Sequence, residues 1–378
     1  MFVCHSHQMK IELAYLVPYM AQLPHEFTIA PLITLSEKDD YAKLISQINH
    51  VSENVSVDPI YLKSPNMSFK NLLNPNVLLH DFLSTINVIR RRKPHAIICY
   101  YLLHAYPLLL LKKIFRFSLS VVAQGSDVNL DNTLLQRIIR KLICRESELI
   151  FACSWSLKDT IEREYNRSVI VVPSSADSSF FKPLQNKLEL RKKWNISPEK
   201  RVLLDVTSFH PLKATDEIVK ALLKIDFKDD VHLLLAGDGG VRKMIEELTV
   251  SLGLQKKVTF LGFRSRSEVL ELYNVAEAFV HISYSEGLPR TLIEAMSCEC
   301  IPIVTDVGSN SAVVKDGVNG FIIRAGDFDK FVERVNDVLS FSRDEKRLMQ
   351  SRARQTVKEK FDSQKIVKRM VNEIINLY

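Results

Sequence analysis

The chain has 378 residues, a formal net charge of +7, 46% hydrophobic residues and 25% charged residues. These shares are those of an ordinary globular protein and exclude a largely disordered chain, and the length favours two domains over one. No run of eighteen apolar residues occurs, and no N-terminal segment combines a basic start, an apolar centre and a small-residue cleavage site. We therefore expect a cytoplasmic protein.

The cysteines agree with a reducing compartment. All six occur singly except Cys298 and Cys300. Their Cys-Glu-Cys spacing is too close for the Cys-x-x-Cys arrangement of redox and zinc sites. We expect free thiols, which agrees with a cytoplasmic location.

The first half of the chain alternates strand and helix patterns. Short apolar runs predict strands at residues 10–17, 59–62, 96–100, 118–123, 148–152 and 168–172. Helical periodicity separates them, as over residues 77–92. Strands that alternate with helices are typical of a parallel α/β domain. We place this domain at residues 1–183, with a linker over 174–183, where small and polar residues end in Lys-Pro.

Positive charge is concentrated in residues 90–145. Eleven Lys or Arg in this segment face two Asp, a local charge of +9, and the rest of the chain sums to −2. The cations are interleaved with Leu, Ile and Phe, as in LLLLKKIFRF and LLQRIIRKLI, which fits adsorption to anionic lipid headgroups. Helices with ordinary solvated faces are the alternative. Nucleic acid is not indicated, because no aromatic platform, zinc finger or helix-turn-helix signal accompanies the charge.

The second half of the chain repeats the alternation of strands and helices. Apolar runs predict strands at residues 202–206, 231–236, 257–261, 278–282 and 301–305. We place a second domain at residues 184–357. The last helix, predicted at 366–377, has one apolar side, and we expect residues 358–378 to pack back on the first domain.

The stretch SYSEGLPRTLIEAMSCECIPIVTDVG, residues 283–308, combines a strand end, a tight turn, a helix and a second strand. Ligands of parallel sheets bind where the carboxyl ends of strands meet helix N-termini. Pro289 suits the first helical turn, and we expect the N–H groups of Gly287 and Leu288 to point outward from that terminus. The pattern predicts a phosphate-binding site.

Glu286 and Glu294 bracket this predicted site. Eight helical residues rise about 12 Å at ~1.5 Å per residue, so the two carboxylates cannot hold one metal ion together. They suit two different parts of an extended ligand. The alternative is structural, with Glu286 capping the helix and Glu294 forming a salt bridge.

The Glu-x7-Glu spacing, with Glu-Gly-Leu-Pro first and Glu-Ala-Met second, resembles the retaining GT-B glycosyltransferases of family 4, the glycosyl transferases group 1. The resemblance implies two Rossmann-like parallel-sheet domains facing a cleft. It also implies that Glu286 lies beside the donor sugar and that Glu294 binds the nucleotide ribose. The amides of Gly287 and Leu288 would hold the diphosphate.

Other segments of the second domain resemble the same family. Lys213 matches a lysine that grips the donor diphosphate, but Ser208 stands where the family has an arginine. A charge-assisted partner worth about 1.5–3 kcal/mol is then missing unless His210 or Arg290 compensates. The loop under the donor and the turn at the base are matched by Gly237, Asp238, Phe263 and Arg264.

The first domain resembles the family only in outline. The family's glycine loop after the first strand is absent, since residues 18–24 begin and end with proline and no glycine precedes Gly125. Gln124 stands where many members have a histidine, and a glutamine cannot titrate. His104, which follows the strand at 96–100, is the candidate for that role, and a structural histidine is the alternative.

The resemblance predicts a retaining, metal-independent glycosyltransferase of the hexosyltransferase type. It would move a sugar from a nucleotide diphosphate, with UDP favoured, to a hydroxyl of a lipid-linked acceptor or a surface glycan such as lipopolysaccharide, capsule or exopolysaccharide. No Asp-x-Asp pair ends a buried strand, so neither a metal nor a cofactor is indicated. The basic segment favours a peripheral position on the inner face of the plasma membrane.

Two other functions stay open. One is a degenerate GT-B protein that binds a nucleotide or a partner without turnover, which the changes at Gln124 and Ser208 and the missing glycine loop favour. The other is a sugar-nucleotide epimerase of the same architecture, which would need catalytic carboxylates in the first domain. The oligomeric state also stays open.

Overall fold

The computed structural model describes residues 2–5, 27–34, 55–57, 60–62, 75–129, 133–227 and 230–377. The chain forms two compact units, which we describe one at a time. Unit 1 consists of Met1–Pro173 and Gln364–Tyr378, and unit 2 of Ser174–Ser363. The strand predicted at residues 10–17 and the proline turn at 18–24 lie outside the described residues. The cleft expected between the domains stays a prediction.

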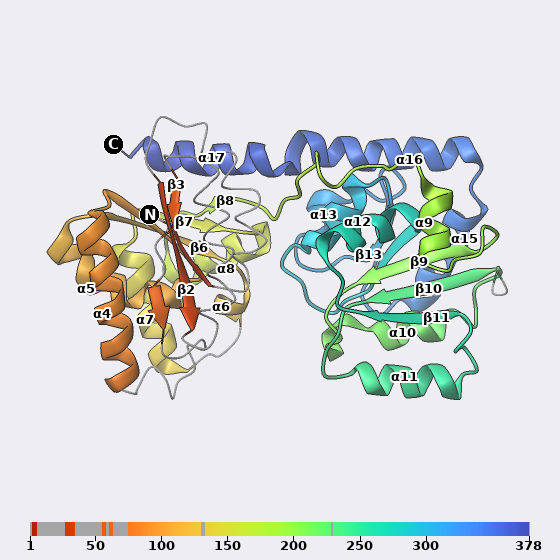
Figure 1. The fold of residues 1–378 in the computed structure, drawn as a ribbon, viewed down its shortest axis with the longest axis horizontal. Helices are drawn as coiled ribbons and strands as arrows, with labels where there is room; N and C mark the ends of the chain where they lie inside the picture. Colours follow the sequence, from red (N-terminus) through yellow and green to blue (C-terminus); the bar gives the residue numbers. More distant parts are fainter. Residues whose placement is uncertain are drawn as a thin grey trace. The chain divides into compact units, whose positions relative to one another are not determined.

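Unit 1 contains a parallel sheet (Figure 1). Its described strands follow the order β3-β2-β1-β5-β6-β7-β8, and β4 pairs with β2. The prediction is confirmed to the residue for β5 and β6, whereas β1 precedes the predicted first strand. The strands of unit 1 are β1 (Phe2–His5), β2 (Phe27–Thr34), β3 (Val55–Val57), β4 (Ile60–Leu62), β5 (Ala96–Tyr100), β6 (Ser118–Ala123), β7 (Leu149–Ala152) and β8 (Ile170–Val171).

Local sequence signals set the ends of the helices in unit 1. α7 begins with a capping box, in which Thr133 and Gln136 bond each other's backbone N–H groups. α5 has Pro107 in its first turn and ends at Phe115, and the next residue, Arg116, adopts a left-handed conformation. No described helix is both long and apolar enough to span a bilayer. The helices of unit 1 are α4 (Pro75–Arg92), η2 (Leu102–Ala105), α5 (Tyr106–Phe115), α6 (Ser126–Asn129), α7 (Leu134–Glu146), α8 (Trp155–Tyr165) and α17 (Ser363–Ile375).

Unit 2 contains a second parallel sheet, whose described strands follow the order β11-β10-β9-β12-β13-β14. The prediction is confirmed to the residue for β10 and β13 and within one residue for β9, β11 and β12, whereas β14 was not predicted. These strands are β9 (Arg201–Val206), β10 (Val231–Ala236), β11 (Val258–Gly262), β12 (Ala278–His281), β13 (Ile301–Thr305) and β14 (Phe321–Ile323).

Two apolar layers cover the sheet of unit 2. Successive residues of a strand point to opposite faces, so Leu203 joins the layer of α10, α11 and α15, and Leu204 joins that of α9, α12 and α13. Figure 1 shows α10 and α11 on one side of this sheet and α12 and α13 on the other. The helices of unit 2 are α9 (Lys187–Lys193), η3 (Pro211–Lys213), α10 (Thr215–Ala221), α11 (Arg242–Ser251), α12 (Arg266–Val275), α13 (Arg290–Ser297), α14 (Asn310–Val313), α15 (Phe328–Ser340), α16 (Arg343–Thr356) and η4 (Val357–Phe361).

The two ends of unit 2 are bonded to each other. The Ala176 N–H donates to the Phe361 carbonyl at 3.1 Å, and the Ser363 N–H donates to the Ala176 carbonyl at 2.9 Å. The Ser178 hydroxyl donates to Asp362 Oδ2 at 2.5 Å. The residues predicted as a linker, 174–183, therefore form part of unit 2.

Candidate active site

The order of the strands reverses in unit 2 between β9 and β12. The chain builds β9, β10 and β11 outward on one side and then places β12 on the other side of β9. Two loops therefore leave the carboxyl ends of adjacent strands, residues 207–210 after β9 and 282–289 after β12. Such a switch point is where ligands bind in open parallel sheets.

The two loops are joined by hydrogen bonds around Leu212. Its carbonyl accepts from the Tyr284 N–H at 2.8 Å. His210 caps the short helix η3, because its Nδ1 accepts from the Leu212 N–H at 3.2 Å. These contacts bring Lys213 to the loop that holds Glu286.

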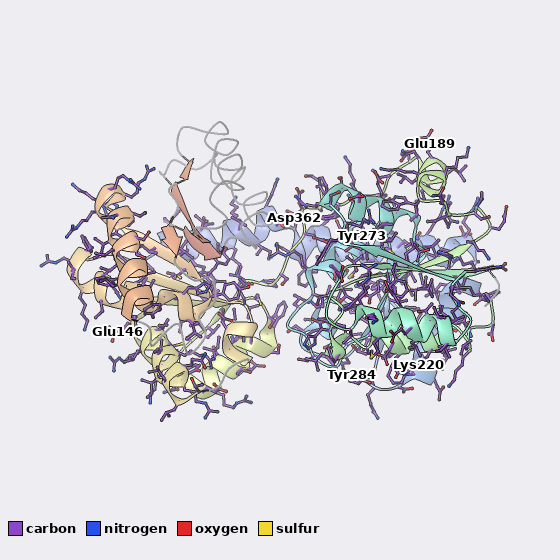
Figure 2. All side chains as sticks on the ribbon, turned by 60° about the horizontal axis from the view of Figure 1, so that its bottom comes forward. Glu146, Glu189, Lys220, Tyr273, Tyr284 and Asp362 are labelled. Atoms are coloured by element: carbon purple, nitrogen blue, oxygen red, sulfur yellow. The ribbon has the colours of Figure 1, made fainter. Side chains whose placement is uncertain are left out.

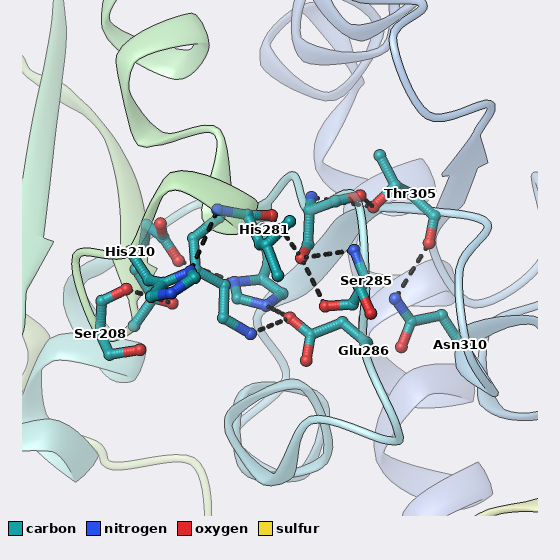
Figure 3. Close-up of polar contacts among 12 residues, drawn as sticks. Ser208, His210, His281, Ser285, Glu286, Thr305 and Asn310 are labelled. Atoms are coloured by element: carbon teal, nitrogen blue, oxygen red, sulfur yellow. Dashed lines mark hydrogen bonds and ion pairs between the residues drawn. The ribbon is translucent and has the colours of Figure 1, made fainter. Parts of the chain in front are cut away.

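Four ionisable side chains form a connected chain at this edge of the sheet (Figure 3). Lys213 Nζ lies 2.5 Å from Glu286 Oε1. His281 Nε2 lies 2.7 Å from the same oxygen, and His281 Nδ1 lies 3.0 Å from Asp205 Oδ1. The structure thus brings Lys213 and Glu286, both singled out from the sequence, into direct contact. It adds Asp205 and His281, which sequence reasoning missed.

A signal for Asp205 and His281 was present in the sequence. Each is a polar residue inside a strand that is otherwise apolar at its buried positions, RVLLDV for β9 and AFVH for β12. A charge in the interior needs a partner. Two such residues in strands of one sheet therefore indicate a pair, although only the strand order shows that they are neighbours.

The geometry of His281 constrains the protonation of this group. A neutral imidazole has one N–H, but both ring nitrogens of His281 face carboxyl oxygens. Burial alone would lower the pKa of His281, and its bonds to Asp205 and Glu286 outweigh burial and raise that pKa to about 9. Burial alone would likewise raise the pKa of Glu286, but His281 and Lys213 lower it to about 2. Glu286 is therefore an ionised acceptor at neutral pH.

One oxygen of Glu286 is left for a ligand. Oε1 accepts hydrogen bonds from both His281 and Lys213. Oε2 has no partner among the residues that the structure describes. The Glu286 side chain is 9% exposed to solvent. A hydroxyl group that enters the site can therefore donate to Oε2 without displacing a protein contact.

The turn before α13 has backbone N–H groups to offer. In the described part of the chain, no acceptor is found for the N–H groups of Gly287 and Leu288. The Gly287 carbonyl is occupied, because the Ser309 N–H donates to it at 2.8 Å. This close approach requires Gly308, whose φ is +62° and whose added Cβ would lie 2.3 Å from the Glu286 carbonyl oxygen. The turn thus suits an anion, and phosphate binding there stays a prediction.

Glu294 is buried inside α13. The Tyr273 hydroxyl donates to its Oε2 at 3.3 Å, and Tyr273 lies within unit 2 (Figure 2). Burial raises the pKa of Glu294 to about 7, although the charges of Arg290 and Arg266 act in the opposite direction. Glu294 is therefore held in a far less polar environment than Glu286, eight residues earlier.

The loop at Gly237 packs directly on the loop after β9. A Cβ added at Gly237 would lie 1.7 Å from the Thr207 carbonyl oxygen, so only glycine allows this contact. Asp238 is engaged within its own loop, where Oδ1 accepts from the Gly239 N–H at 2.8 Å and Oδ2 pairs with Arg242 at 3.0 Å. The loop is thus next to the switch point.

Phe263 and Arg264 follow β11, which lies two strands from β9 in the sheet. Phe263 is 79% exposed. Arg264 donates to the Leu261 carbonyl and lies 3.3 Å from Glu268, and its guanidinium stands 5.8 Å from the centre of the Trp194 ring. An exposed ring beside a held guanidinium is available for stacking.

The two residues named as substitutes for the missing arginine are placed differently. His210 is exposed next to Ser208, but its Nδ1 is already used as the cap of η3. Arg290 begins α13 and is half-buried, and its charge acts on Glu294. Whether either one compensates for Ser208 stays a prediction.

His104 lies in unit 1 on the short helix η2. Its ring is 5.3 Å from that of Tyr101. The adjacent loop is held by Asp127, a buried carboxylate that accepts from the N–H groups of Leu102 at 2.7 Å and Gly125 at 2.9 Å. Asp127 therefore supports the strand ends β5 and β6, and the substrate role of His104 stays a prediction.

The structure describes the side chains of five cysteines, which are free and buried: Cys99, Cys144, Cys153, Cys298 and Cys300. Burial raises the thiol pKa of Cys144 and Cys300 to about 12, so these thiols are neutral and unreactive. Within the described ranges, no three His, Cys, Asp or Glu side chains are grouped to hold a metal ion.

Sequence comparison identifies relatives for part of the chain. Residues 186–356 match the family described as "Glycosyl transferases group 1". The chain is 31% identical over 252 residues to an N-acetyl-alpha-D-glucosaminyl L-malate synthase of Bacillus anthracis. The aligned region covers 65% of this chain and 63% of that protein. It is 26% identical over 199 residues to a D-inositol 3-phosphate glycosyltransferase of Mycobacterium marinum, which covers 51% and 42%. The chain thus spans less than two thirds of these curated relatives.

Solved structures agree over nearly the whole chain. A glycosyltransferase from Rickettsia africae superposes with a TM-score of 0.81 at 16% identity, over 98% of this chain and 97% of that one. Anabaena Alr3699/HepE in complex with UDP superposes with a TM-score of 0.79 at 18% identity, over 99% of each. Both units of the chain therefore have the parallel-sheet architecture of GT-B glycosyltransferases, and residues 186–356 are similar to the glycosyl transferases group 1 family.

Proposed function

We propose that this chain is a glycosyltransferase that moves a sugar from a nucleotide diphosphate to an acceptor hydroxyl. The main support is the contact of Lys213 with Glu286 beside a turn whose Gly287 and Leu288 amides find no acceptor in the described residues. A cation and two amides suit a diphosphate, and an ionised carboxylate suits sugar hydroxyls. The similarity of residues 186–356 to the group 1 family agrees with this function.

Each part of the donor has its own residues in this proposal. Lys213 has three N–H donors and Glu286 takes one, so two remain for phosphate oxygens. Glu286 Oε2 accepts from a hydroxyl of the transferred sugar, and Glu294 binds the ribose. The loop at Gly237 and Asp238 lies under the donor, and the turn at Phe263 and Arg264 meets the base. UDP is favoured because HepE was solved with UDP and with UDP-glucose.

The proposed reaction retains the configuration of the sugar. The bond from the anomeric carbon to the diphosphate oxygen breaks, and a bond to the acceptor oxygen forms on the same face. The acceptor proton moves to an oxygen of the departing diphosphate. Lys213 and the turn amides offset the negative charge that develops on this leaving group, so the scheme needs no metal ion.

We also propose that unit 1 adsorbs to an anionic membrane, where lipid-linked or surface-glycan acceptors are built. The exposed face of α7 carries aliphatic side chains four residues apart, Leu134, Ile138 and Leu142. On the same face lie Arg137 and Lys141. Arg145 lies there too but pairs with Glu146 at 2.9 Å. Large aliphatic residues on an exposed face are not needed by a merely solvated helix, and cations between them suit anionic headgroups.

A neighbouring helix extends this surface. α5 packs against α7 and exposes Leu110, Lys113 and Ile114. Lys112 does not contribute, because it pairs with Glu148 at 2.6 Å. The surface is therefore defined as the exposed residues of α5 and α7.

Thermal melting with nucleotide diphosphates tests the donor assignment. A ligand at a hundred times its dissociation constant adds about 2.7 kcal/mol to the free energy of unfolding. We expect UDP to give the largest shift, and UDP release in the presence of a UDP-sugar and an acceptor. A shift with GDP alone, or with no diphosphate, would overturn the donor assignment.

The degenerate binding protein is the second candidate, and one observation favours it. Ser208 is exposed and cannot replace the charge of the family's arginine. The same experiment separates the two functions, because a degenerate protein would bind UDP but release none from UDP-sugars with any acceptor.

A further inference from the structure

Asp205 and His281 lie below Glu286 and away from solvent. Asp205 is 0% exposed and His281 is 2% exposed, whereas the side chains of Glu286 and Lys213 are 9% and 21% exposed. They come from the adjacent strands β9 and β12. Neither one can touch a ligand directly, because Glu286 stands between them and the site.

This pair is not explained by stability. Ionic groups buried between apolar strands lose hydration, and an apolar pair of the same size packs there at no such cost. Asp205 Oδ2 has no partner within the described residues, and burial raises the pKa of this carboxyl. The His281 ring stacks on Phe279, with the ring centres 5.6 Å apart. A buried polar pair that leaves one oxygen unsatisfied suggests a task at Glu286.

We propose that Asp205 and His281 are positioning residues that hold Glu286 with Oε1 bound and Oε2 turned to the donor sugar. Asp205 Oδ1 keeps a proton on His281 Nδ1, so that Nε2–H donates to Glu286 Oε1. Lys213 Nζ contacts the same oxygen, Glu286 Oε1, and completes the group. This inference rests on the proposed glycosyltransferase activity.

With both carboxyl groups ionised, the charges of the group are balanced only when His281 is protonated. Asp205 and Glu286 are then negative, His281 and Lys213 are positive, and the buried group is neutral overall. The charged groups that act on His281 are Asp205 and Glu286, and Lys213 acts on both carboxylates. Loss of the His281 proton leaves two carboxylates with one cation, so Glu286 loses a donor and its fixed orientation.

A spectroscopic experiment tests the pair without any enzyme assay. Imidazole ¹⁵N NMR of the whole chain, assigned with His281→Gln, should show protons on both ring nitrogens of His281 at neutral pH. Asp205→Asn should lower the pH at which that signal titrates. A single protonated nitrogen in the parent, or no change in Asp205→Asn, would overturn the proposal.

Kinetics then test what the pair does. Asp205→Asn should lower kcat by about 10- to 100-fold, the range for residues that orient a functional group, with donor KM changed little. His232→Gln is the matched control, because His232 also lies on a strand of this sheet and bonds a neighbouring side chain, Thr259 at 2.8 Å. An unchanged kcat in a folded Asp205→Asn would overturn the positioning role.

The outcomes separate this inference from the proposed function. If the parent binds no diphosphate and transfers no sugar, the glycosyltransferase proposal fails, whatever the NMR shows. If the parent transfers sugar and Asp205→Asn does so equally well, only the positioning role fails. If Asp205→Asn does not fold, the protonation of His281 in the parent still decides whether the pair is charged as proposed.

Discussion

His281 is the last residue of β12, and Glu286 lies in the loop that follows this strand. His281 Nε2 lies 2.7 Å from Glu286 Oε1. This contact, together with Lys213 on the same oxygen, leaves Oε2 as the side of the carboxylate that faces incoming groups. The division of one carboxylate into a held oxygen and an open one is the basis of the first prediction.

Glu286→Gln should lower kcat by about 10²-fold or more, the scale of a lost contact to the transition state. A neutral amide at this position also leaves His281 and Lys213 with Asp205 as the one carboxylate of the group. Steady-state kinetics with a UDP-sugar and an acceptor measure the effect. Glu247→Gln is the control, since Glu247 is an exposed residue of α11. A Glu286→Gln enzyme with parental kcat would contradict the assignment.

Glu294→Gln should raise the donor KM and leave kcat near the parental value. The ribose does not change during the reaction, so its contacts stabilise the ground state and the transition state equally. The measurement is a donor titration at saturating acceptor. Equal losses of kcat in Glu286→Gln and Glu294→Gln would show that the two glutamates do not have separate tasks.

Glu294 should also make the stability of the chain depend on pH. Burial raises its pKa to about 7 in the folded state from the ordinary value of 4.5, so the folded state keeps a proton that the unfolded chain has lost. The free energy of unfolding therefore falls as pH rises from about 4.5 to about 7, by up to about 1.4 kcal/mol per pH unit. Glu294→Gln removes this effect, and melting curves of both proteins across that window should diverge. Curves that stay parallel would contradict the burial of a titrating Glu294.

Gly308→Ala should damage the turn that presents the Gly287 and Leu288 amides. The added Cβ would lie 2.5 Å from the Gly287 carbonyl oxygen, so the turn must move. Gly253→Ala is the matched control: its φ is +69°, but a Cβ there meets nothing within 4 Å. We expect the control to cost about 1–2 kcal/mol of stability from backbone strain alone. Gly308→Ala should cost more and weaken UDP binding by about 10-fold, measured by calorimetry. Equal effects would leave the turn without a special role.

Reversal of charge on α7 should release the chain from anionic vesicles. Arg137→Glu with Lys141→Glu removes two headgroup contacts, each worth about 1 kcal/mol near the surface. Co-sedimentation with vesicles that contain or lack phosphatidylglycerol measures binding, and added salt should weaken it. Lys243→Glu, an exposed position of α11 in unit 2, is the control. Absent binding in the parent, or binding that survives the reversal, would leave α7 as a solvated helix.

Local patterns were sufficient for β5, β6 and the strands β9 to β13 and for part of the site, but not for β1 or β14. β10 and β13 are short apolar runs bounded by turns, and such runs have little alternative to a buried parallel strand. Glu286 and the amides of Gly287 and Leu288 are adjacent along the chain, so the turn before α13 places them by itself. Lys213 was found through the family resemblance, and the bonds of Leu212 explain why it reaches Glu286.

The tertiary structure decided what stands behind Glu286. Asp205 and His281 are 76 residues apart and meet only because β12 pairs with β9 rather than with β11. Strand order depends on how helices pack on both faces of the sheet, which no local pattern encodes. The same holds for Glu294. The amphipathic spacing of α13 allows this residue on either side of the helix, and its packing against Tyr273 buries it. Sequence alone therefore determined which residues could act on a ligand, and the fold determined which of them are charged and held in place, since pKa and orientation depend on neighbours distant in the chain.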